Sequence, residues 1–320
     1  MTYYLFLLVL CAVAEVFYFR IADKFNIIDK PNERSSHSSI TIRGGGVVFS
    51  VAGVAMAIYS AFFMPWFWLG FILISILSFV DDVKTLSSKV RLPLQIFAVM
   101  LLVFQGLHDG APLWIWLVAV VLATGIINAY NFMDGINGIT AGYSLVVLFS
   151  LLWINQSIAF ADDAFIVTFI IADVVFGFFN FRKKAKCFAG DVGSVSIAFV
   201  IVFLLFELIL KTQNFFYIML LAVYGADSVL TIIYRLRKKE NIFEAHRSHL
   251  YQWLVKPGPF SHLQMSGMYM ILQVFVSVGV IFLINEGWVL QLSFSASVLI
   301  IFLLIYVNIK RVYKTRYGLV

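Results

Sequence analysis

Charged residues are scarce in this chain of 320 residues: Asp, Glu, Lys and Arg together make up 12% of it, and hydrophobic residues 62%. A soluble domain usually contains about a quarter charged and about half apolar residues. The shortage of charge therefore excludes a water-soluble core. The apolar residues come in long runs, such as 47–80 and 292–307, and runs of about 18 or more apolar residues are typical of membrane spans.

Cysteine is scarcer still, with two residues in the chain. Cys11 lies inside the first apolar run and Cys187 lies in a basic loop far along the chain. We therefore expect neither a disulfide nor a structural zinc site, which needs more ligands. Basic residues are also missing before the first apolar run, whereas Arg20 and Lys24 follow it. This order indicates an uncleaved first span and not a signal peptide.

A separate soluble domain is missing as well. The longest polar segment, 235–263, is too short to fold independently. The sequence also contains no internal repeat and no low-complexity stretch. We predict one all-α, polytopic integral membrane domain over residues 1–320, with its functional side chains on the loops.

Eleven apolar segments of helix length are predicted to be transmembrane helices, because they lack the alternating pattern of barrel strands. Their predicted boundaries are 3–21, 44–63, 65–80, 92–107, 111–128, 138–154, 163–180, 192–210, 215–234, 264–285 and 288–308. Pro65 leaves room for only one tight turn between the second and third spans.

The basic residues predict the orientation. With the N-terminus outside and the C-terminus inside, every Lys and Arg except Lys211 falls on the inside. Basic residues gather on the cytoplasmic side of membrane proteins. The net charge of +6 then lies at the membrane surface, where anionic lipid head groups and phosphate-bearing substrates are the expected partners and nucleic acid is not.

Five polar clusters stand out at the predicted inner ends of the spans. Burying an Asp at the centre of a membrane helix costs roughly 2.5–3.5 kcal/mol, so acids close to lipid suggest function. The first cluster is 29–46, in which Arg43 precedes three glycines that open a span. Glycines let the backbone approach a ligand, and free N–H groups at a helix start bind anions. A flexible loop is the other interpretation.

The second cluster is Asp81 and Asp82, followed by Lys84. Two adjacent carboxylates favour a cation or a proton between them, which suits magnesium binding or proton abstraction, and Lys84 suits a phosphate. A solvated helix end is the alternative.

The third cluster has no basic residue and is rich in Asn, Asp and Gly. Asn128, Asn131 and Asp134 recur every three residues, so that on a helix they would share a face. Together with Asn137, these groups could hold a nucleotide or a hard cation. An ordinary turn rich in Asn and Gly is the alternative.

The last two clusters lie around Asp191 and at 246–249. Asp191 lies between glycines at the start of a predicted span, which suits either a helix N-cap or a metal ligand. His246, Arg247 and His249 lie in the long polar loop and could bind a pyrophosphate. They lack the glutamate and the spacing of a zinc protease. A solvated basic loop is the other interpretation.

Together these motifs resemble the polyprenyl-phosphate N-acetylhexosamine-1-phosphate transferases. This family includes the phospho-N-acetylmuramoyl-pentapeptide transferase of peptidoglycan synthesis and the enzymes that start O-antigen. The similarity rests on residues 81–82, 128–138, 190–194 and 246–249, in matching order over 29–251. The eleventh span and the inside C-terminus are similar to the O-antigen-initiating branch.

The resemblance implies an enzyme of the bacterial inner membrane with its site at the cytoplasmic face. It would transfer N-acetylhexosamine-1-phosphate from a UDP-sugar to undecaprenyl phosphate and release UMP, which starts a lipid-linked glycan such as O-antigen. Magnesium, with manganese as the alternative, would bind Asp191 and Asn131 and neutralise charge on the diphosphate. Asp81 or Asp82 would position or deprotonate the lipid phosphate.

The resemblance also implies a set of substrate-binding residues. They are Arg43, Lys84, Asn128, Asn131, Asp134, Asn137, His246, Arg247 and His249. Asn137 stands where many relatives have Asp, which leaves nucleobase recognition open.

An ion-coupled multi-span transporter is the competing function, since intramembrane acids and glycine-broken helices are also typical of carriers. Glu15, Asp173, Glu207 and Asp227 are such acids, but they do not pair by an inverted repeat. A non-catalytic scaffold would leave the five clusters unexplained. The sequence decides neither which UDP-sugar is used nor whether the protein forms a homodimer.

Overall fold

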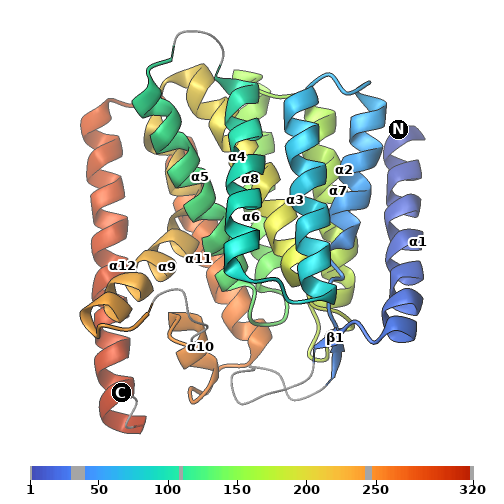
Figure 1. The fold of residues 1–320 in the computed structure, drawn as a ribbon. Helices are drawn as coiled ribbons and strands as arrows, with labels where there is room; N and C mark the ends of the chain where they lie inside the picture. Colours follow the sequence, from blue (N-terminus) through green and yellow to red (C-terminus); the bar gives the residue numbers. More distant parts are fainter. Residues whose placement is uncertain (1, 30–39, 108–110, 242–246, 318–320) are drawn as a thin grey trace.

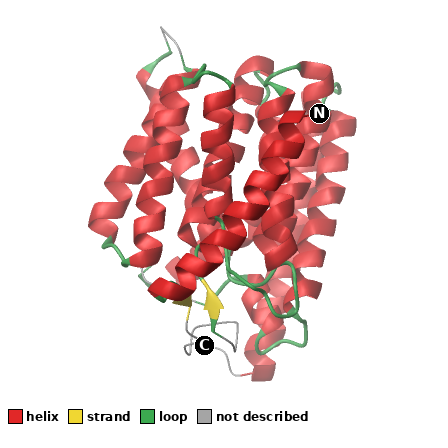
Figure 2. Ribbon diagram, turned by 90° about the vertical axis from the view of Figure 1, so that its right-hand side faces the viewer, coloured by secondary structure: helices red, strands yellow, loops and turns green. Residues whose placement is uncertain are grey.

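A computed structural model describes residues 2–29, 40–107, 111–241 and 247–317 of the chain. The helices form a bundle with the loops at its two ends (Figure 1). The two short strands are confined to one of these ends (Figure 2). In chain order the elements are α1 (Thr2–Phe25), β1 (Ile28–Asp29), β2 (Thr41–Ile42), α2 (Val47–Tyr59), α3 (Pro65–Val83), α4 (Ser88–Gly106), α5 (Leu113–Met133), α6 (Ile139–Ile158), α7 (Asp163–Asn180), α8 (Gly190–Thr212), η1 (Phe215–Leu221), α9 (Ala222–Arg237), α10 (Leu250–Val255), α11 (His262–Leu283) and α12 (Trp288–Tyr317).

Ten segments of the described chain are long and apolar enough to cross a membrane, which confirms the prediction of an all-α polytopic membrane protein. One of them combines η1 and α9 as Phe215–Arg237. The predicted span 163–180 coincides with α7. Most ends of the others lie within about five residues of the observed helices, but α12 continues to Tyr317, well past the predicted end at 308. The single domain over 1–320 stays a prediction.

The second predicted span, 44–63, differs because it forms the 13-residue helix α2, which is short for a bilayer crossing. Ala61 and Phe62 have positive φ and end the helix on one side. On the other side Gly46 packs against α8 so closely that an added Cβ would lie 2.1 Å from the Gly193 Cα. The chain still passes from one end of the bundle to the other here, since α1 begins and α12 ends at opposite ends of the bundle (Figure 1).

An extended segment between α1 and α2 lies against the start of α8. β1 pairs antiparallel with β2, and Ile42 forms a parallel bridge with Cys187. The amide of Gly45 donates to the carbonyl of Phe188 at 2.8 Å. The glycines therefore bring two segments of the protein together, and this amide is not available to the ligand expected from the sequence.

The helix α8 is the most deeply buried of the ten spans, and α12 is the most exposed. The ring of Phe67 on α3 lies 4.3 Å from that of Phe203 on α8. Closer to the acidic residues, the hydroxyl groups of Ser75 and Ser196 are 3.0 Å apart, and such small residues let membrane helices approach each other. This packing of α3 against α8 fixes the carboxylates that both helices carry at their ends.

Candidate active site

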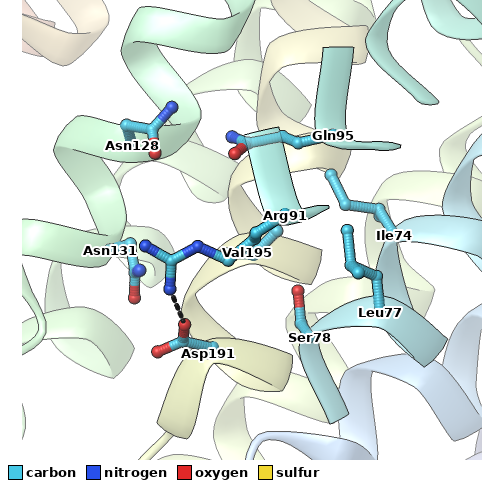
Figure 3. A pocket seen from close by; sticks show the side chains of 9 residues that line it. All are labelled: Ile74, Leu77, Ser78, Arg91, Gln95, Asn128, Asn131, Asp191 and Val195. Carbon is cyan, nitrogen blue, oxygen red and sulfur yellow. Dashed lines mark hydrogen bonds and ion pairs between the residues drawn. The ribbon is translucent and has the colours of Figure 1, made fainter. Parts of the chain in front are cut away.

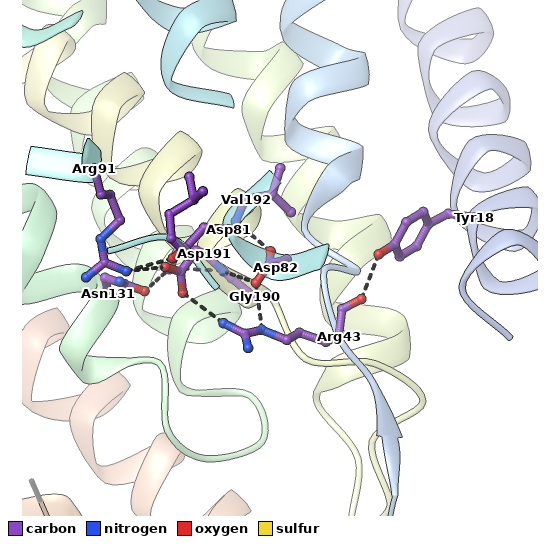
Figure 4. A network of polar contacts seen from close by, with 11 residues as sticks. Tyr18, Arg43, Asp81, Asp82, Arg91, Asn131, Gly190, Asp191 and Val192 are labelled. Atoms are coloured by element: carbon purple, nitrogen blue, oxygen red, sulfur yellow. Dashed lines mark hydrogen bonds and ion pairs between the residues drawn. The ribbon is translucent and has the colours of Figure 1, made fainter. Parts of the chain in front are cut away.

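The three aspartates predicted to be catalytic lie together with two arginines, where the ends of α3, α4 and α8 meet (Figure 4). Arg43 donates from Nε to Asp82 Oδ1 at 2.7 Å and from Nη2 to Asp191 Oδ1 at 3.4 Å. Arg91 donates from Nη1 to Asp81 Oδ2 at 2.7 Å and to Asp191 Oδ2 at 3.0 Å. The arginines thus link Asp191 to both members of the acidic pair. We call these five side chains the acidic cluster.

Asp82 anchors the start of α8. Its Oδ1 accepts the amide of Asp191 and its Oδ2 that of Val192, both at 2.9 Å, so that one carboxylate serves two amides that a helix start leaves unpaired. Gly190 has a φ of +70°, and an added Cβ there would lie 2.4 Å from Asp82 Oδ2. The side chains of Asp82 and Asp81 are both buried, with 0% and 3% exposure. Asp82 accepts two backbone amides, whereas Asp81 accepts one, that of Leu86 at 2.6 Å, which favours Asp81 over Asp82 for contact with a substrate.

A small pocket lies beside Asp191, with about 10 Å³ of free space, or room for about one water. Its lining consists of Ile74, Leu77, Ser78, Arg91, Gln95, Asn128, Asn131, Asp191 and Val195. Arg91 and Asn131 lie next to Asp191, whereas Asn128 and Gln95 lie farther from it (Figure 3). A phosphate can enter only when side chains such as Arg91 move.

Asn128 and Asn131 lie one turn apart on α5 and both line the pocket, so the predicted shared face is confirmed for these two residues. Nδ2 of Asn128 donates to the carbonyl of Thr124 at 2.8 Å. Oδ1 of Asn131 accepts the hydroxyl of Ser194 at 2.8 Å. This last bond ties α5 to α8 one turn beyond Asp191.

Asp134 and Asn137 are not among the residues that line this pocket. Asp134 follows the end of α5 and no longer continues its face, and its Oδ1 accepts the hydroxyl of Thr140 at 2.7 Å. Nδ2 of Asn137 donates to the carbonyls of Arg182 and the next residue, at 2.8 and 3.2 Å. Asn137 thereby holds the basic segment after α7. Contact of either residue with a nucleotide stays a prediction.

The histidine loop, residues 246–249, joins the polar segment after α9 to α10. His246 lies outside the described residues. The side chain of His249 is 3% exposed, and its Nδ1 lies 3.4 Å from Asp227 Oδ1. Tyr269 donates its hydroxyl to the other oxygen of Asp227 at 2.6 Å. His249 therefore faces the protein interior, which does not favour the predicted phosphate contact, and that of Arg247 stays a prediction.

Two features of the site were missed or placed differently by sequence reasoning. Arg91 counted only as a basic loop residue, although it joins two carboxylates. Its signal is its place in the first turn of α4, after a short loop that returns the chain to the end of α3. Lys84 directly follows α3 and is exposed. It takes no part in the hydrogen bonds of the acidic cluster within the described chain.

The acidic cluster has three carboxyl groups and two guanidinium groups. Burial acts to lower the pKa of Arg43, but the carboxylates of Asp82 and Asp191 outweigh it and raise that pKa. At the end of α5, outside the acidic cluster, burial raises the pKa of Asp134 to about 7, although the hydrogen bond from Thr140 acts to lower it. Asp134 can therefore gain or lose a proton near neutral pH.

The oxygen atoms here suit a hard cation. Carboxylates of Asp81 and Asp191 and the amide oxygen of Asn131 are the ligand types that magnesium prefers. In the described chain, however, no three His, Cys, Asp or Glu side chains are grouped as a metal site. Arginines instead bind these carboxylates. The donor chemistry thus fits magnesium, and a bound ion would have to replace at least one arginine contact.

Comparison with known proteins bears on the family of this chain. Residues 64–209 match the model of glycosyl transferase family 4. The probable undecaprenyl-phosphate N-acetylglucosaminyl 1-phosphate transferase of Bacillus subtilis (strain 168) is 30% identical, over 89% of this chain and 84% of its own. The chain belongs to the polyprenyl-phosphate N-acetylhexosamine-1-phosphate transferase family. It is also similar to undecaprenyl-phosphate alpha-N-acetylglucosaminyl 1-phosphate transferases of Salmonella typhi and Escherichia coli O157:H7. They are 27% and 25% identical, over 75% and 92% of this chain and 72% and 87% of theirs.

Proposed function

We propose that this protein transfers N-acetylhexosamine-1-phosphate from a UDP-sugar to undecaprenyl phosphate and releases UMP. The observation that carries the proposal is the gathering of Asp81, Asp191 and Arg91 beside a pocket, at one end of a bundle whose family uses a polyprenyl acceptor. The donor is soluble and anionic, and the acceptor is lipid. Their phosphates can meet where a polar pocket opens beside membrane helices.

The reaction needs one bond to form and one to break. An oxygen of the lipid phosphate binds the phosphorus next to the sugar, and the bond from that phosphorus to the bridging oxygen breaks, so that UMP leaves. The second pKa of a phosphate monoester is about 6, so the nucleophile is largely ionised at neutral pH. We therefore assign Asp81 to positioning the acceptor more than to removing its proton.

Two arginines balance the negative charge of the carboxylates and of the substrate phosphates. Arg43 and Arg91 form ion pairs with carboxylates of the acidic cluster, and their guanidinium groups match phosphate geometry. When phosphates arrive, these side chains can transfer their hydrogen bonds from aspartate to phosphate. Asp191, with Asn131, would hold magnesium or manganese, which supplies charge neutralisation to the diphosphate.

The site is proposed to face the cytoplasm of a bacterial inner membrane, where UDP-sugars are found. The basic residues of the loops at this end of the bundle support that orientation. The product would start a lipid-linked surface glycan such as O-antigen. The homodimer stays a prediction.

A direct assay tests the proposal. Purified enzyme, undecaprenyl phosphate, magnesium and a panel of UDP-N-acetylhexosamines should yield UMP and a lipid-linked sugar diphosphate, with one sugar preferred. Omitting the lipid is the control for hydrolysis. Solute uptake into vesicles without any UMP release would favour the transporter, an alternative that finds no support among the relatives.

A further inference from the structure

Lys310 is a buried cation on a helix that mostly faces lipid. Of the 30 residues of α12, all of them described, three are buried: Gln291, Tyr306 and Lys310. Gln291 lies near the start of the helix, and the other two lie near its end. A lysine near the end of a membrane helix normally extends its amine to water. The burial of Lys310 therefore requires contacts that compensate its lost hydration.

Those contacts are three aromatic rings and a carbonyl group. Nζ of Lys310 lies 3.4 Å from the ring centre of Trp253, 4.9 Å from that of Tyr234 and 5.3 Å from that of Tyr306. It also donates a hydrogen bond to the carbonyl of Ser248. A desolvated cation over aromatic rings is held firmly. One ammonium group thus joins α12 to α9, to α10 and to the histidine loop, which lie at the same end of the bundle (Figure 1).

The chain after the histidine loop is held from a second side by Asp227 of α9. Its two oxygens accept the amides of Leu250 and Tyr251, at 2.9 and 3.4 Å. These are the first amides of α10, which a helix leaves unpaired. The backbone of residues 248–251 is therefore fixed between a buried lysine and a buried aspartate.

Tyr251 connects α10 to the residues that line the pocket. Its hydroxyl donates to the carbonyl of Phe132 at 3.1 Å, and the next residue back along the chain is Asn131, which lines the pocket. An added Cβ on Gly135 would lie 2.1 Å from the Tyr251 hydroxyl oxygen, so the contact is close on both sides. A shift of α10 would therefore displace the end of α5.

We propose that Lys310 is a positioning residue of the active site. By holding Trp253 and Ser248 against α12, it sets the place of the histidine loop and, through Tyr251, of Asn131. This inference rests on the proposed function, which places Asn131 and the pocket that it lines beside the diphosphate of the substrate. A binding site that is in place for part of the time loses apparent affinity in proportion. Removing the ammonium group should therefore raise KM for the UDP-sugar more than it lowers kcat.

The test compares Lys310→Met with Lys310→Arg and with Lys314→Met. Lys314 lies one turn farther along α12 and is exposed, so it is a matched control. We expect Lys310→Met to raise KM for the UDP-sugar about tenfold, which corresponds to about 1.4 kcal/mol. Lys310→Arg keeps the charge and should lie between this variant and the wild type, and Lys314→Met should match the wild type.

Hydrogen exchange gives a readout that a general loss of stability would not produce. In Lys310→Met, peptides over 248–255 should exchange faster while peptides of α3 and α8 stay unchanged. If that variant does not fold, Trp253→Leu carries the test, with the same direction in KM and exchange.

Two results would overturn the inference while leaving the proposed function intact. One is a Lys310→Met enzyme with the KM and exchange of Lys314→Met. The other is a uniform fall in melting temperature and kcat with KM unchanged. A wild-type enzyme that releases no UMP would instead overturn the proposed function itself.

Discussion

Two buried aspartates hold helix starts in the same way at two places in the bundle. Asp82 accepts the first amides of α8, both at 2.9 Å, and Asp227 accepts the first amides of α10, at 2.9 and 3.4 Å. Each thereby replaces the backbone partners that a helix start lacks. The two regions have the same anchor and differ in what surrounds it.

Around Asp82 the neighbouring side chains are partly exposed to solvent. Arg43 is 33% exposed in its side chain and Asp191 is 14% exposed, and Asp191 lines the pocket. Around Asp227 the partners are closed, since the side chain of His249 is 3% exposed. A buried aspartate therefore does not by itself mark a catalytic position. The exposure of its neighbours separates the region that can exchange partners with a substrate from the region that supports it.

We expect the largest effect on activity at Asp191, in the partly exposed region around Asp82. Asp191→Asn keeps the size of the side chain and removes the charge that we assign to the metal and the diphosphate. We expect UMP release to fall about 100- to 1000-fold. Thermal stability should stay level or rise, because one of three close carboxylates is lost. A variant with full activity would contradict the assignment.

The two anchors should respond alike in stability. Asp82→Asn and Asp227→Asn each leave one acceptor for two amides and remove a buried charge from its partners. We expect each to lower the free energy of unfolding by about 2–3 kcal/mol. Thermal unfolding in detergent measures both, with Asp162→Asn, at an exposed helix start, as the control. A loss at only one anchor would show that the likeness between them is superficial.

Arg91 sharpens the comparison because the closed region has no equivalent bridge between two acids among the described residues. Arg91→Lys keeps the charge but replaces a planar fork by a single ammonium group. We expect UMP release to fall about tenfold, with a change of less than about 1 kcal/mol in stability because the pair is partly exposed. Lys89→Arg, an exposed change on the same helix, should leave the rate unaltered.

We expect the smallest effect at Cys187, which tests how far water reaches into the region around Asp82. Cys187 is buried beside Gly45, with its Sγ donating to Glu15 Oε1 at 3.3 Å. Burial, then the nearby Glu15 carboxyl, raises the pKa of this thiol well above its usual range. The thiol should therefore stay neutral, and folded protein should not react with maleimide between about pH 6 and 9. Labelling that increases with pH in folded protein would show that water reaches this side too.

Much of the fold was predictable because the bilayer imposes long apolar runs. The predicted span 163–180 and the observed α7 coincide. The span 44–63 is the exception, because its short helix depends on the contact between Gly46 and Gly193. That contact joins residues far apart in the sequence, so no local sequence pattern predicts it.

The acidic cluster was predictable in part. The adjacent carboxylates of Asp81 and Asp82 gave two of its members, and the spacing of Asn128 and Asn131 gave two residues that line the neighbouring pocket. The roles of the partners were not predictable, since hydrogen bonds between distant residues decide them. Asp82 proved to be an anchor because the start of α8 lies against it, and His249 turned inward because Asp227 lies behind it.

The uneven burial of α12 also bears on how its sequence can change over time. Side chains in contact with lipid need only remain apolar, so most of this helix can drift freely. Tyr306 and Lys310 cannot drift independently of Trp253 and Tyr234. Across related proteins, we expect these four positions to be retained or lost as a set, within a helix that otherwise keeps only its hydrophobicity.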